Sequence, residues 1–74
     1  MTKYPEIEVK LIGEDGNAFF ILGKVTQSLK RGLKQIYNLS YDEINQIVKS
    51  YNDEATSGDY DNLLSVTMKY VEVI

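Results

Sequence analysis

The stretch IEVKLIGEDGNAFF, residues 7–20, decides the fold expected for this chain. Ile7, Val9 and Leu11 alternate with charged residues, which is the period of a strand with one buried face. Ile12 is apolar on the other face, so the strand is expected to become more enclosed towards its end. We predict a strand over residues 6–12.

A tight turn and a helix start are expected directly after this strand. Gly13 and Gly16 bracket Glu14 and Asp15, and glycine tolerates the positive φ that a sharp reversal needs. Asn17 is a good helix N-cap. Backbone amides converge at such a junction, so Gly13, Gly16 and Asn17 form a candidate anion site. The two carboxylates in the turn favour a plain turn and cap instead.

The first helix is expected over about residues 18–37. Apolar residues at three-and-four spacing predict a core stripe, with Val25 beside it: Phe19, Leu22, Thr26, Leu29, Leu33 and Ile36. Gly32 could end the helix early, but Ile36 stays in phase and favours continuation. The opposite face is the candidate binding surface, together with Tyr37 at the helix end, and its members are Phe20, Lys24, Gln27, Arg31 and Lys34. The plain alternative is that Phe20 packs locally and the charges are solvated.

Two more helices follow, at about residues 41–56 and 59–71. Asn38 is suited to a left-handed helix end, and Ser40 with Glu43 forms a capping box. Asp59 is expected to cap the third helix. Three of the six tyrosines lie on core-facing stripes, namely Tyr51, Tyr60 and Tyr70.

Residues 70–74 alternate again and could form a short strand. A lone first strand would leave its backbone groups unpaired, so either these C-terminal residues or the strand of a second copy must dock beside it. The fold class expected is α+β, in one small domain of 74 residues.

Composition argues against catalysis and against a metal or cofactor site. The chain has no histidine and no cysteine, which removes the usual general base, the readiest nucleophile and the commonest metal ligands. The acids near SGDYD do not follow the calcium-loop pattern. No apolar run approaches the roughly 20 residues of a membrane span, and the N-terminus has no signal-peptide core, so a cytoplasmic protein is expected.

Charge is divided unevenly along the chain. Residues 16–41 carry four basic residues and no acid, whereas residues 42–61 carry six acids and one lysine. These segments could pair internally, pair between subunits, or face separate partners.

The strings DGNAFF and ATSGDYDNLL, within a pattern that covers about residues 6–73, resemble a family of short uncharacterised proteins of phages and bacterial genomes. The resemblance implies no activity, cofactor or catalytic residue. It implies a small protein that binds a host or phage macromolecule, such as an anti-defence factor.

The leading hypothesis is a non-catalytic binding protein that forms a homodimer. One alternative is a nucleic-acid binder that uses the basic face of the first helix, with Phe20 stacking on bases; the net charge of −3 disfavours it. Another alternative is a small-ligand sponge that holds a nucleotide-like molecule between the turn at residues 13–17 and that basic face.

Overall fold

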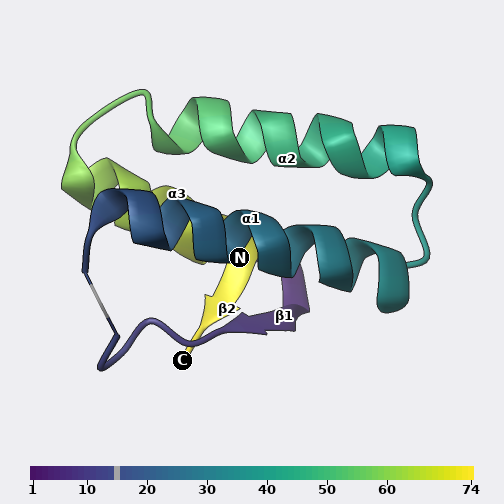
Figure 1. Ribbon diagram of the computed structural model, residues 1–74, viewed down its shortest axis with the longest axis horizontal. Helices are drawn as coiled ribbons and strands as arrows, with labels where there is room; N and C mark the ends of the chain where they lie inside the picture. Colours follow the sequence, from purple (N-terminus) through teal and green to yellow (C-terminus); the bar gives the residue numbers. More distant parts are fainter. Residues whose placement is uncertain (15) are drawn as a thin grey trace.

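A computed structural model describes residues 1–14 and 16–74 and has an α+β fold, as the sequence predicts (Figure 1). Its elements in chain order are β1 (Tyr4–Val9), α1 (Ala18–Gln35), α2 (Tyr41–Ala55), α3 (Tyr60–Tyr70) and β2 (Val71–Val73). The helices α1 and α3 lie between α2 on one side and the two-stranded sheet on the other.

The sheet joins the two ends of the chain. β1 pairs with β2 in parallel, with Glu8 beside Glu72 and Val9 beside Val73. The Ile74 N–H donates to the Val9 carbonyl oxygen at 2.9 Å and extends this pairing beyond β2. Of the two partners expected for the first strand, the C-terminal residues of the same chain are therefore the ones that pair.

The first strand lies earlier than residues 6–12. It begins at Tyr4 and contains Pro5, where the pairing is irregular and a missing N–H is tolerated. It ends at Val9 because β2 is short. Leu11 and Ile12 both donate their N–H to the single Ile74 carbonyl oxygen, so the regular ladder stops there.

The three predicted helix N-caps are confirmed. The Asn17 side chain accepts from the amides of Phe19 and Phe20. Ser40 and Glu43 bond to each other's backbone amide in a capping box. The Asp59 side chain accepts from the third amide after it, at 2.9 Å.

The helix ends are close to those expected. α1 continues through Gly32 but stops at Gln35, two residues early. Asn38 has φ of 56°, the predicted left-handed conformation, and the Leu39 N–H then donates to the Leu33 carbonyl oxygen at 3.0 Å. α3 ends at Tyr70 because Val71 is already extended and begins β2.

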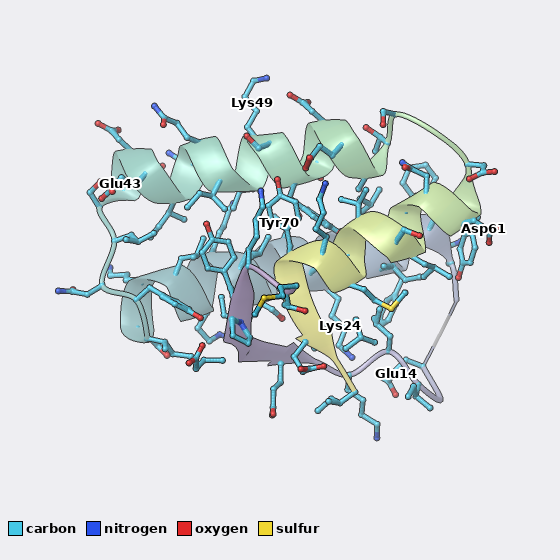
Figure 2. All side chains as sticks on the ribbon, turned by 180° about the vertical axis from the view of Figure 1, so that it is seen from behind. Glu14, Lys24, Glu43, Lys49, Asp61 and Tyr70 are labelled. Atoms are coloured by element: carbon cyan, nitrogen blue, oxygen red, sulfur yellow. The ribbon has the colours of Figure 1, made fainter. Side chains whose placement is uncertain are left out.

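The core lies where the helices and the sheet meet (Figure 2). The predicted stripe on α1 was wrong at its two ends, because Phe19 is 83% exposed and Ile36 is 53% exposed. The face of α1 that packs in the core carries Ile21, Val25, Leu29 and Leu33, so Ile21 is buried instead of Phe19. The buried apolar residues of the core are Ile7, Val9, Ile21, Val25, Leu29, Leu33, Ile44, Tyr51, Ala55, Leu63, Val66, Tyr70 and Val71.

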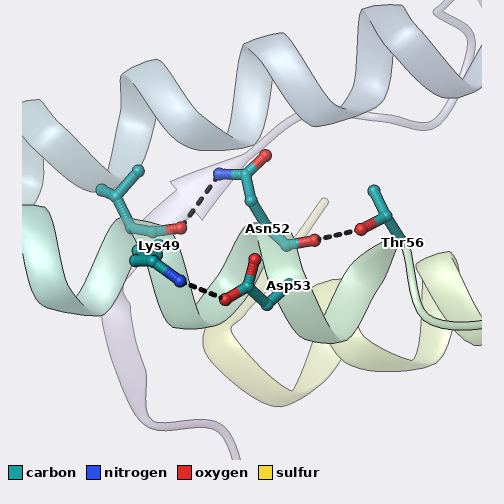
Figure 3. A network of polar contacts seen from close by, with 5 residues as sticks. Lys49, Asn52, Asp53 and Thr56 are labelled. Carbon is teal, nitrogen blue, oxygen red and sulfur yellow. Dashed lines mark hydrogen bonds and ion pairs between the residues drawn. The ribbon is translucent and has the colours of Figure 1, made fainter.

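Polar contacts join α2 to α1 beside this core. The Asn52 side-chain amide donates to the Thr26 hydroxyl at 3.1 Å and to the Val48 carbonyl oxygen at 2.9 Å. On the outer face of α2, Lys49 pairs with Asp53 at 2.8 Å (Figure 3). Asn52 therefore fixes the contact between the helices, whereas the exposed ion pair adds little.

Candidate functional site

Half of the predicted basic face gathers around one hollow. Phe20, Lys24 and Gln27 line it together with Phe19, and its volume is about 430 Å³. The Lys24 ammonium group donates to the Lys10 carbonyl oxygen at 2.6 Å and to the Glu14 carboxylate at 3.1 Å. It also lies 5.6 Å from the centre of the Phe20 ring. Lys24 thus ties α1 to the end of the strand, and Glu14 offsets its charge.

The other residues of the predicted surface lie elsewhere. Arg31 borders a separate groove between α1 and β1. Lys34 is exposed in the last turn of α1. Tyr37 lies beyond the helix, where its hydroxyl donates to the Glu6 carboxylate at 2.5 Å and its ring meets Tyr4 edge-on. The bond to the Glu6 carboxylate raises the pKa of Tyr37. Its contacts connect the end of α1 to β1.

The backbone groups of the turn predicted as an anion site bond to other parts of the protein. Gly13 has φ of 82°, as expected for the reversal, and nothing would contact a Cβ there. The Gly16 carbonyl oxygen accepts the Tyr60 hydroxyl at 2.6 Å. The amides of Phe19 and Phe20, which would face an anion, are bonded to the Asn17 side chain. The part of the prediction that concerns Asp15 lies outside the described residues.

An apolar hollow that sequence reasoning missed lies between α3, the end of β2 and the segment after β1. Its volume is about 300 Å³. Ile12 borders it and is 73% exposed, so the expectation that the strand becomes enclosed here was wrong. The chain leaves the sheet at Leu11 and carries Ile12 to the surface. The lining residues are Leu11, Ile12, Gly16, Ile21, Tyr60, Leu64, Met68 and Val73.

Two further hollows lie beside the apolar hollow, around the N-terminus of α1. Tyr60, which was expected in the core, borders both the apolar hollow and one of about 280 Å³ that contains Asp59. Phe19 borders the latter and the hollow beside Lys24. The exposed large side chains that line these three hollows form what we call the apolar surface: Ile12, Phe19, Phe20, Tyr60 and Met68.

The sequence did contain a signal for this surface. Ile12 is apolar on the wet side of its strand, and two adjacent phenylalanines cannot both face the core of one helix. Ile12 and Phe19 are expected in the interior from the pattern, whereas Phe20 is placed on the candidate binding face. Met68 gave no such signal, because it lies within a helix rich in apolar residues.

Acidic groups do not gather in a metal site in the described part of the chain. Residues 1–14 and 16–74 contain no group of three or more acidic side chains placed to hold an ion. Among the helices that the structure describes, none is both long and apolar enough to span a membrane.

In comparisons with known proteins, no family model matches this chain, and no curated protein or solved structure matches it significantly.

Proposed function

We propose that this chain is a small non-catalytic binding protein that works as a homodimer joined at the apolar surface. The observation that supports it best is the exposure of Phe19 between two hollows at the N-terminus of α1. Contiguous exposed apolar side chains on a soluble domain commonly mark an interaction surface. Aromatic residues and methionine are enriched in such surfaces.

Charge around Phe19 favours a second copy as the occupant. Lys24 lines the hollow on one side of Phe19, and Asp59 lines the hollow on the other side. A two-fold axis near Phe19 would bring Lys24 of each copy, which also bonds its own Glu14, towards Asp59 of the other, so the added contact would be between opposite charges. One edge of β1 is paired with β2, so the strand does not need a second copy as its partner, and the dimer contact that we propose is the apolar surface.

The solution mass tests this proposal. Light scattering over a dilution series should show a dimer that dissociates to a monomer. Phe19→Ser should weaken the dimer by about tenfold or more, because a central aromatic contact carries much of the energy of an interface. Tyr41→Ser is the matched control, since Tyr41 is 78% exposed on α2 and lies outside the apolar surface. A monomer at every concentration, or equal effects of the two variants, would contradict the proposal.

A nucleic-acid binder remains the second candidate, favoured by the contact between Lys24 and the Phe20 ring. Backbone phosphates need unpaired cations, and Lys24 is bonded to Glu14. Binding of single-stranded DNA at low ionic strength that weakens steeply with salt would favour this function over the dimer.

The resemblance to phage proteins supports a second part of the proposal, which concerns the partner that the dimer binds. We propose that the dimer acts on a host or phage macromolecule, and a surface away from the dimer contact is then needed to bind it.

A further inference from the structure

One edge of β1 has no strand beside it in the described part of the chain. The sheet has two strands, so β2 covers a single edge of β1. The opposite edge faces a groove of about 220 Å³ between the strand and α1. Its floor is close to the crossing of β1 and α1, where a Cβ on Gly32 would lie 2.5 Å from Ile7. The lining residues are Glu6, Ile7, Glu8, Ser28, Arg31, Gly32, Gln35 and Ile36.

Backbone groups of β1 point into this groove. The Val9 carbonyl oxygen and the Leu11 N–H are both bonded to Ile74, so they face β2. Successive residues of a strand direct these groups to opposite edges, and those of Glu8 and Lys10 therefore face away from β2. The bond from Lys24 on α1 to the Lys10 carbonyl oxygen at 2.6 Å agrees with this direction. The N–H and carbonyl of Glu8 are thus placed to pair with a further strand.

Two side chains mark the ends of this open edge. Lys24 bonds the backbone at Lys10, and the Tyr37 hydroxyl bonds the Glu6 carboxylate at the other end. The stretch between them, residues 6–10, matches a strand of about five residues. An extended segment that lies between a strand and a helix is an established mode of peptide recognition.

Charge decides which segment fits. Ile7 and Val9 are buried, so Glu6 and Glu8 project from the outer face of the sheet. Glu8 lies beside Glu72 on that face, and no ion pair in residues 1–14 and 16–74 includes either carboxylate. Like charges side by side on a sheet are unfavourable, and basic neighbours relieve them.

A second copy of β1 is a poor occupant in the register centred on Ile7. Antiparallel pairing centred on Ile7 would set Glu6 of one chain opposite Glu8 of the other at both ends. Residues of an added strand that point inwards would instead meet Ile36, with Gln35 and Arg31 beside it, which favours apolar side chains over basic ones.

We propose that the free edge of β1 binds an extended segment of another protein as a third strand, with lysine or arginine beside Glu6 and Glu8 and apolar residues between them. The proposal rests on the proposed role as a binding protein but does not need the dimer, because the groove lies apart from the apolar surface.

A labelled synthetic peptide of about eight residues with alternating lysine and valine is the probe, since it has the expected pattern and a strand's length. Fluorescence anisotropy measures its binding, and a peptide of the same composition with the lysines grouped together is the control peptide. Amide hydrogen exchange followed by NMR provides the second measurement. The alternating peptide should bind more tightly than the control and should slow exchange at the Glu8 amide.

Charge variants locate the contact. Glu8→Lys should weaken binding by about tenfold, because attraction is replaced by repulsion beside the added strand. Glu72→Lys is the matched control: it changes the same kind of side chain on the same face, one strand further from the free edge. If Glu8→Lys does not fold, Glu8→Gln is the variant to test, and it should weaken peptide binding by a smaller factor.

Three results would overturn the proposal: equal binding of the two peptides, an unprotected Glu8 amide at saturation, or equal losses for Glu8→Lys and Glu72→Lys. The last result would mean that the peptide binds the acidic face through charge alone. Light scattering of the same samples reports the dimer independently, so a failure of the proposed function is distinguished from a failure of strand addition.

Discussion

The hydroxyls of Tyr51 and Thr67 lie 2.7 Å apart in the core, where both side chains are fully buried. Each hydroxyl is the hydrogen-bond partner of the other in a site away from water, so neither is left as an unpaired polar group. Burial raises the pKa of Tyr51, which keeps its hydroxyl protonated and able to donate. The Tyr51 ring also meets Tyr70 edge-on at 5.3 Å. This pair therefore fixes α2 against α3 at one position.

Removing one of these two hydroxyls should lower the free energy of unfolding more than removing both. Thr67→Val leaves the Tyr51 hydroxyl buried without its partner and should lower the free energy of unfolding by about 1–3 kcal/mol. Adding Tyr51→Phe to this variant should recover part of the loss, because no unpaired hydroxyl then remains. Urea denaturation of the wild type, both single variants and the double variant measures the coupling. Strictly additive losses would show that the hydroxyls do not depend on each other.

At the scale of single elements, the local features were predictable and the non-local ones were not. The caps at Asn17, Ser40 and Asp59 depend on residues within three positions, so the sequence contains all of the information. The face that α1 buries depends on where β1 and α2 approach it. An apolar stripe is wide enough to fit more than one rotation, and the periodicity placed Phe19 in the core.

The candidate binding face shows the same division. Helical spacing brings Phe20, Lys24 and Gln27 together, as predicted. The bond from Lys24 to Lys10 spans 14 positions, and the bond from Tyr37 to Glu6 spans 31. Such contacts follow from the packing of β1 on α1, which periodicity alone does not specify.

The crossing of β1 and α1 predicts opposite effects for two glycines in one helix. A Cβ at Gly32 would lie 2.5 Å from Ile7 Cγ1, whereas nothing lies within 4 Å of a Cβ at Gly23. Gly32→Ala should lower the free energy of unfolding by about 1–3 kcal/mol through overpacking. Gly23→Ala should raise it by about 0.5–1 kcal/mol, because alanine favours the helix. Thermal and urea unfolding measure both, and stabilisation by Gly32→Ala would show that the strand and helix are not in close contact.

For the whole molecule, the uneven charge is not neutralised between α1 and α2. The ion pairs in the described residues are Lys24 with Glu14, Lys49 with Asp53, and Lys69 with Glu54, and none of them joins these two helices. Internal pairing of the basic and acidic segments is therefore not what holds the described fold together. Lys30, Arg31 and Lys34 on α1, which none of these ion pairs includes, remain available for contacts between copies or with partners.

Two carboxylates make the stability of the whole domain sensitive to acid. The Tyr70 hydroxyl donates to Glu54 at 2.7 Å, and this bond lowers the pKa of Glu54 below the ordinary value of 4.5, with help from Lys69 and Lys3. The backbone amide of Ser40 lowers the pKa of Glu43 in the same direction. A carboxyl group with a lowered pKa binds its proton less tightly in the folded state than in the unfolded state. Protonation of either group therefore favours unfolding.

The free energy of unfolding should consequently be constant above these carboxyl pKa values and should decrease as the pH falls below about 4.5, through the folded-state values. Glu54→Gln and Glu43→Gln should each lower stability near neutral pH and flatten this acid dependence, because the glutamines cannot titrate. Glu72→Gln is the control, since Glu72 is exposed on β2 and none of the ion pairs above includes it. Urea denaturation between about pH 2 and pH 7 measures the slope for each variant. An acid slope in Glu54→Gln as steep as that of the wild type would show that the bond from Tyr70 does not contribute to stability, and that α2 and α3 are held together by other contacts, such as apolar packing, the Tyr51–Thr67 pair and the bond from the Asn62 side chain to the Glu54 carbonyl oxygen.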